Sequence, residues 1–265
     1  MDLGLTDRVA LVTGASMGIG LAVATRLAEE GCHVAMVARR PGPLEEAAAD
    51  IAAATGRDII ALPGDMTSWD DAERVAAETI EHFGHVDIAV PNAGSSPGGL
   101  LEDLTPEQWD GSLNLKFMGH VRTVRAVIGH MRERGSGNIT MVVGNDGLKP
   151  SHWELAAGVA NAADHNFASS IAIQYAPHGI RVNTVNPGPV ATTRWDTLEK
   201  AFARDKGISQ DRAHELTLSS LPLGYICTPE EVADVVVFLA SDRASYINGA
   251  HVPVDGGQRK ALMDR

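Results

Sequence analysis

The chain has 265 residues, of which 44% are hydrophobic and 21% are charged, and its net charge is -12 at pH 7 with histidine neutral. This length suits one large α/β domain with a buried core and is short for two domains. The acidic excess argues against a general binder of nucleic acids or of anionic membranes, because both partners select a basic face.

The cysteines and the amino-terminal segment indicate where the protein works. Cys32 and Cys227 show neither CxxC nor metal-ligand spacing, so we expect reduced, buried thiols and no metal site. The apolar run 9–12 is far too short to span a bilayer, and no basic segment precedes a long apolar one. We therefore expect a cytoplasmic protein without a membrane span.

Short apolar runs alternate with longer amphipathic segments along the chain. We expect strands at residues 8–12, 33–38, 58–62, 86–90, 138–143, 180–185 and 250–254. Helical periodicity covers residues 21–30, 44–54, 70–83, 108–132, 162–175 and 230–239. The alternation predicts one α/β domain over residues 1–265, a Rossmann-type three-layer domain with a doubly wound, mostly parallel sheet.

The segment 194–223 departs from this rhythm, because it is long and mixed in charge and lies between two expected strands. We predict a helical lid over a pocket there. Its apolar residues are expected either to line a substrate site or simply to pack the lid onto the sheet: Trp195, Leu198, Phe202, Leu216 and Leu218, with Trp153 nearby. Residues 259–265 are expected to form a short polar extension.

The first expected strand leads directly into the glycine-rich segment TGASMGIG, residues 13–20, and a helix follows it. Glycines allow a tight turn and a close approach to a pyrophosphate, while the helix N-terminus supplies N–H donors. Because open parallel sheets bind ligands at the carboxyl ends of their strands, we predict a dinucleotide here. The expected contacts are Gly14, Ser16, Met17, Gly18, Ile19 and Gly20.

The spacing Gly-x-x-x-Gly-x-Gly after a threonine resembles the short-chain dehydrogenase/reductase family, and further motifs follow in the family's order. Residues 64–67 (GDMT) resemble the segment whose Asp reaches adenine, and residues 91–94 (PNAG) resemble the family's NNAG with proline in first place. Residues 186–192 (NPGPVAT) resemble the segment that holds the nicotinamide carboxamide, and residues 249–257 resemble the last strand. The resemblance covers nearly the whole chain.

This resemblance implies an NAD(P)-dependent oxidoreductase that acts on a small carbonyl or alcohol substrate as a homodimer or homotetramer, without nucleic acid or membrane as a partner. It also implies a further set of cofactor contacts: Asp65, Met66, Asn92, Ala93, Gly94, Pro187, Gly188, Val190 and Thr192.

The end of the second expected strand bears on the choice of cofactor. An NAD-preferring pocket places a carboxylate there for the ribose hydroxyls, but this chain has Ala38 followed by Arg39 and Arg40. Guanidinium groups bind a 2′-phosphate, so the pattern favours NADP, with NAD possible. The family's other common basic position holds Met17, so one of the two signals for NADP is missing. The alternative is that Arg39 and Arg40 belong to a solvated loop.

The family's usual catalytic side chains are missing from their expected places. The resemblance implies a Ser, a Tyr, a Lys and an Asn, but counting back from residues 176–183 puts Ala157 at the Tyr and Asn161 at the Lys. The fifth expected strand puts Gly144 at the Ser, and Asn114 matches the Asn. No tyrosine lies between residues 144 and 174, so a small shift of register does not restore the site.

Other polar residues must therefore carry any proton chemistry. The candidate catalytic residues are Asn114, Asp146, His152 and Asn161, with Glu154 as a further polar neighbour. His152 could equally be an exposed loop residue, Asp146 a turn former and Glu154 a first-turn helix residue. Three functions stay open: hydride transfer with an unusual acid, a non-redox reaction of lyase or retro-aldol type, and nucleotide binding without turnover.

Overall fold

The computed structural model describes residues 1–258 and shows a seven-stranded parallel sheet in the order β3-β2-β1-β4-β5-β6-β7. Each observed strand overlaps a predicted one, and the predicted fold class is confirmed. The strands are β1 (Val9–Thr13), β2 (His33–Ala38), β3 (Ile59–Pro63), β4 (Ile88–Val90), β5 (Gly137–Val142), β6 (Ile180–Pro187) and β7 (His251–Val254). The expected polar extension at 259–265 lies outside the described residues.

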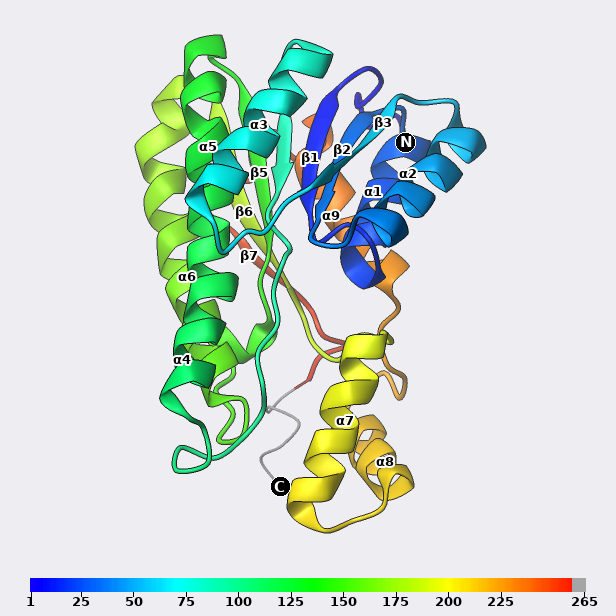
Figure 1. The fold of residues 1–265 in the computed structure, drawn as a ribbon, viewed down its shortest axis with the longest axis vertical. Helices are drawn as coiled ribbons and strands as arrows, with labels where there is room; N and C mark the ends of the chain where they lie inside the picture. Colours follow the sequence, from blue (N-terminus) through cyan, green and yellow to red (C-terminus); the bar gives the residue numbers. More distant parts are fainter. Residues whose placement is uncertain (259–265) are drawn as a thin grey trace.

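Helices cover both faces of the sheet (Figure 1). On one face, α1 (Gly18–Glu29), α2 (Pro41–Thr55) and α9 (Pro229–Ala240) bury side chains such as Val23, Leu44 and Val236. On the other face, α3 (Trp69–Phe83), α5 (Met118–Arg134) and α6 (Leu155–Tyr175) bury Val75, Val127 and Ile171. The strands are buried from both sides, which explains their nearly continuous apolar sequences.

The strand order places a binding crevice at the carboxyl ends of the central strands. From β1 the chain moves outward through β2 and β3, and it then returns to β4 on the other side of β1. Thr13 pairs in register with Val37, and Val12 with Val90, so β1, β2 and β4 end at nearly the same level. Connections that leave such neighbouring strands in opposite directions open a crevice between them.

The predicted helix at 108–132 is wrong in one respect, because a π turn interrupts it. The segment consists of α4 (Pro106–Ser112), a π turn (Leu113–Phe117) and α5. Arg122 stabilises the turn, since its Nη1 donates to the Asn114 carbonyl at 2.9 Å and its Nη2 to Asn114 Oδ1 at 2.6 Å. A π turn adds one residue to the helical turn and so changes which side chains face the sheet.

The segment predicted as a lid is helical. We call α7 (Thr193–Lys206) and α8 (Gln210–Ser220) the lid pair; it lies beyond the carboxyl ends of the strands (Figure 1). Trp153 joins the lid pair's apolar cluster, and its Nε1 donates to Asp205 Oδ2 at 3.0 Å. Within residues 1–258 no helix is long and apolar enough to cross a membrane, and no group of three His, Cys, Asp or Glu residues could hold a metal.

Candidate active site

A cavity of about 930 Å³ runs along the carboxyl ends of the strands, from the glycine turn to the lid pair. The structure brings all of the predicted cofactor residues to its wall: Gly14, Ser16, Met17, Gly18, Ile19, Gly20, Arg39, Arg40, Asp65, Met66, Asn92, Ala93, Gly94, Pro187, Gly188, Val190 and Thr192. These residues come from five separate loops, which follow β1, β2, β3, β4 and β6, and the fold gathers them into one wall.

The glycine turn leaves a space that a dinucleotide diphosphate fits. Gly14 adopts a φ of 68°, and a Cβ there would lie 2.9 Å from Asn92 Nδ2. The helix α1 starts at Gly18, and Met17 at its N-cap forms no side-chain cap. The N–H groups of the first helical turn have no intrahelical acceptor, so they are available to an anion.

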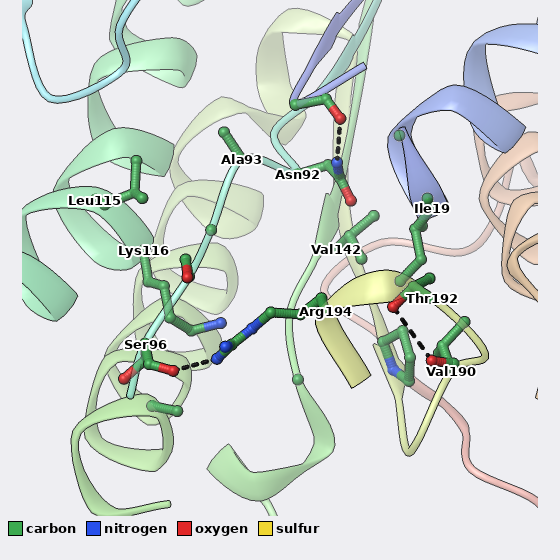
Figure 2. Close-up of a pocket in the computed structure, with 18 of the residues that line it drawn as sticks. Ile19, Asn92, Ala93, Ser96, Leu115, Lys116, Val142, Val190, Thr192 and Arg194 are labelled. Carbon is green, nitrogen blue, oxygen red and sulfur yellow. Dashed lines mark hydrogen bonds between the residues drawn. The ribbon is translucent and has the colours of Figure 1, made fainter. Parts of the chain in front are cut away.

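Hydrogen bonds with the end of β1 hold the Asn92–Gly94 turn in place, and Figure 2 draws one bond that the Asn92 side chain donates. Thr13 Oγ1 accepts hydrogen bonds from the backbone N–H of Asn92 at 3.0 Å and of Ala93 at 3.2 Å. In return, Asn92 Nδ2 donates to the Thr13 carbonyl at 2.9 Å. The turn after β4 is therefore fixed against the glycine turn, and both face the same cavity.

The far end of the cavity carries positive charge. Arg39 and Arg40 follow β2, are exposed and line the cavity, and within the described chain neither forms a hydrogen bond or an ion pair. Asp65, which also lines the cavity, forms its hydrogen bonds within its own turn. Its Oδ1 accepts from the backbone N–H and from Oγ1 of Thr67, each at 2.9 Å. The two guanidinium groups are thus available to a phosphate.

Two of the four predicted catalytic residues meet at the other end of the cavity. Asn161 on α6 donates through Nδ2 to Asp146 Oδ1, and both side chains line the cavity while being largely buried. Asp146 also belongs to a 3-10 turn at Asn145–Gly147, so the structural role considered for it is present as well. Its other carboxylate oxygen, Oδ2, accepts no hydrogen bond from the described residues.

Gly144 makes room for this pair. A Cβ at position 144 would lie 2.5 Å from Asn161 Nδ2 and 2.6 Å from Asp146 Oδ1. A serine in that place could not coexist with the Asp146–Asn161 contact unless one partner moved. The glycine and the two polar residues therefore form one unit, although Asn161 lies 15 positions from Asp146 in the sequence.

The other two predicted catalytic residues lie outside the cavity. Asn114 is exposed and is held by Arg122, and His152 is exposed in the loop before α6. Lys116 lines the cavity instead, two residues further along the π turn. Helical periodicity does not indicate a π turn, so Lys116 was not among the predicted site residues.

A buried histidine–carboxylate couple was also missed. His120 Nδ1 lies 2.9 Å from Asp164 Oδ2, and the two side chains are 2% and 0% exposed. Within the described chain, His120 Nε2 and Asp164 Oδ1 have no hydrogen-bond partner, and His120 lines the cavity. The couple joins α5 to α6 across 44 positions of sequence, a separation that no local pattern reveals.

A hydrogen bond connects the lid pair to the segment that follows the Asn92–Gly94 turn. Arg194, in the first turn of α7, donates through Nη2 to the Ser96 carbonyl (Figure 2). Burial lowers the pKa of Arg194, an effect that the carboxylates of Glu154 and Asp146 partly offset. Trp195 and Leu198 line the cavity, whereas Trp153 and Phe202 pack edge-to-face with their ring centroids 5.6 Å apart.

Comparison with known proteins identifies the family. The family model described as Enoyl-(Acyl carrier protein) reductase matches residues 14–259. The human protein named Dehydrogenase/reductase SDR family member 4 is 32% identical over 259 residues, which cover 97% of this chain and 90% of that protein. The chain belongs to the short-chain dehydrogenase/reductase family.

Other members of this family agree in sequence and in structure. The acetoacetyl-CoA reductase of Allochromatium vinosum is 32% identical over 254 residues, covering 94% of this chain and 98% of that one. The structure of L-sorbose reductase from Gluconobacter frateurii, complexed with NADPH and L-sorbose, superposes with a TM-score of 0.91 at 33% identity, covering 97% and 98% of the two chains. The relatives are reductases and dehydrogenases, so the predicted oxidoreductase class is confirmed.

The three positions that the sequence register assigns to the family's Ser, Tyr and Lys all lie along the cavity. They hold Gly144, Ala157 and Asn161, respectively. No tyrosine is found among the described residues of this wall, and its one lysine, Lys116, is on the π turn.

Proposed function

We propose that the chain is an NADP(H)-dependent oxidoreductase that interconverts a small or medium-sized carbonyl compound and its alcohol through a non-standard proton-exchanging site. The observation that carries this proposal is one continuous cavity that has two unpaired arginines at one end and the Asp146–Asn161 pair at the other. Such a cavity can hold a dinucleotide along its length and leaves space for a substrate beside the lid pair.

The residues present fit the cofactor. The first turn of α1 would bind the diphosphate, Arg39 and Arg40 would bind the 2′-phosphate, and the Pro187–Thr192 segment would hold the carboxamide end. The NADPH in the structure of the L-sorbose reductase relative supports this preference, with NAD as the weaker ligand. When bound, the nicotinamide supplies or accepts the hydride.

Asp146 is the group that we propose to exchange the proton. In alcohol oxidation, the hydroxyl proton passes to the Asp146 carboxylate as the carbon gives up its hydride, and in carbonyl reduction the same carboxyl returns the proton. Asn161 orients Asp146 by donating to Oδ1, which leaves Oδ2 for the substrate. The backbone at Gly144 lies beside this pair, so the reacting oxygen can approach without a side chain in the way.

A stoichiometry measurement tests the function. The protein is incubated with NADPH and a panel of aldehydes and ketones, and separately with NADP⁺ and alcohols, and the consumed cofactor is compared with the product. We expect equal amounts of the two. Substrate conversion without net change in NADPH would favour the non-redox alternative, and saturable NADPH binding without any turnover would favour a nucleotide sensor; both contradict the proposal.

Assembly and location remain part of the proposal. The family resemblance implies a homodimer or homotetramer, and the lone cysteines and the amino-terminal segment favour a cytoplasmic protein. Sedimentation equilibrium of the full chain would show one defined oligomer if the assembly is as proposed, whereas a monomer at all concentrations would contradict it.

A further inference from the structure

Two cationic side chains meet in the part of the cavity that faces the lid pair. Lys116 reaches the cavity from the π turn, and Arg194 reaches it from the first turn of α7. Figure 2 shows the Lys116 ammonium group pointing toward the Arg194 guanidinium, with Ser96 beside them. The two residues come from elements on opposite sides of the cavity, so the fold itself brings the charges together.

Neither charge is neutralised within the described part of the chain. Arg194 donates to the uncharged Ser96 carbonyl and forms no ion pair there. Lys116 forms neither a hydrogen bond nor an ion pair with residues 1–258, although its side chain is half-buried and its Cγ would lie only 3.2 Å from a Cβ at Gly94. Two neighbouring cations with reduced access to water repel each other, and an anion between them relieves the repulsion.

The acidic residues of the same wall serve other partners. Asp146 accepts from Asn161, and Asp164 holds His120, so these carboxylates belong to the opposite, α6 side of the cavity. Glu154 and Asp146 both act electrostatically on Arg194. Within residues 1–258, however, neither Lys116 nor Arg194 has a carboxylate as an ion-pair partner.

We propose that Lys116 and Arg194 form a subsite for a carboxylate group of the substrate, which makes the substrate a hydroxy acid or oxo acid. The inference rests on the proposed function, since it names the substrate class of that site. The alcohol carbon of the hydroxy acid loses a hydride to the cofactor and its hydroxyl proton to Asp146. The carboxylate is unchanged and fixes the substrate between the two sides of the cavity.

The cofactor's own phosphates are the other source of an anion, but the geometry favours the substrate. The diphosphate fits the first turn of α1, and the 2′-phosphate fits Arg39 and Arg40. Ser96 instead follows the Asn92–Gly94 turn after β4, which β1 separates from β2 in the sheet, and Lys116 lies on the π turn. An anion held there would bind together with the cofactor and would not compete with it.

Equilibrium binding tests the subsite without requiring turnover. Pyruvate, acetoacetate and levulinate are each titrated calorimetrically into the protein saturated with NADP⁺, and each is compared with its uncharged methyl ester. We expect at least one acid to bind about tenfold or more tightly than its ester, the scale of one charge-assisted hydrogen bond. The preference should disappear in Lys116→Met and Arg194→Met and should survive in Lys116→Arg.

The control is Lys200→Met, which removes the same charge from an exposed position on α7 outside the cavity wall. We expect it to bind the acids and the esters as the unmodified protein does. Equal binding of acids and esters by the unmodified protein would overturn the proposal. So would an equal loss for acid and ester in Lys116→Met, or competition between the acids and NADP⁺.

The binding experiment also separates this proposal from the proposed function. If the protein transfers no hydride but still prefers the acids, the subsite stands and the oxidoreductase assignment fails. If hydride transfer is found with neutral ketones and no acid preference exists, the function stands and the subsite fails.

Discussion

The two ends of the cavity differ in how far they follow the family. At the β1–β3 end, the glycine turn, the Asn92–Gly94 turn and the Arg39–Arg40 pair are arranged to receive a dinucleotide. At the β5–α6 end, the sequence register assigns Gly144, Ala157 and Asn161 to the positions where the family resemblance implies two hydroxyls and an ammonium group, and all three residues line the cavity. Cofactor binding depends largely on backbone shape, whereas proton transfer depends on particular side chains, so one end can change while the other is retained.

The largest effect is expected from Asp146→Asn, which removes the proposed proton-exchanging group. An amide of the same shape cannot carry the proton, so kcat should fall about 100- to 10,000-fold, the usual contribution of a general acid or base. The affinity for NADPH should change little, because Asp146 lies at the opposite end of the cavity from Arg39. Steady-state kinetics and a cofactor titration check the two parts.

The matched control for that variant is Asp110→Asn on the exposed surface of α4. It should leave kcat unchanged. A kcat within twofold of the unmodified enzyme in Asp146→Asn would show that the proton passes through another group, with the His120–Asp164 couple as the next to examine.

The second-largest effect is expected from Gly144→Ser, which tests whether Gly144 makes room for the Asp146–Asn161 pair. Gly144→Ser should lower the free energy of unfolding by about 1–3 kcal/mol, because its Cβ would overlap Asn161 and Asp146. Asn161→Ala removes one of the two clashing groups, so the double variant should recover part of this loss. Urea unfolding of the two single variants and the double variant measures the interaction energy. Strict additivity would mean that the three residues do not act as a unit.

The smallest effect is expected at the cofactor end. Arg39→Ala should weaken NADPH binding about tenfold while leaving NADH binding nearly unchanged, since an exposed guanidinium contributes on the order of 1–2 kcal/mol to a phosphate contact. Arg57→Ala is a control that removes an arginine paired with Asp7 outside the cavity. Equal losses for both cofactors in Arg39→Ala would show that the arginine is not selective for the 2′-phosphate.

The sequence predicted the local structure of the glycine turn well because its determinants are local. A strand, a glycine turn and a helix lie within residues 9–29, and their geometry follows from the chain itself. The proton-exchanging end depends on contacts between distant segments, such as Asp146 with Asn161 and His120 with Asp164. The π turn that brings Lys116 into the cavity is held by tertiary contacts of Arg122, and helical periodicity alone predicts a regular helix there.

The two ends therefore teach different lessons about prediction from one sequence. Residues that shape the backbone, such as Gly14, could be assigned from their motif, and the structure places all of the predicted cofactor residues along the cavity. Residues that act through their side chains were placed less completely, because Asp146 and Asn161 line the cavity whereas Asn114 and His152 lie outside it.

The most direct test of the account is a titration of ligand-free protein with NADPH and with NADH. Trp195 lines the cavity, so tryptophan fluorescence can report the binding. We predict saturable binding of both dinucleotides, with NADPH the tighter ligand. If neither dinucleotide binds at millimolar concentration, the result contradicts the claim that the glycine turn and α1 hold a dinucleotide diphosphate.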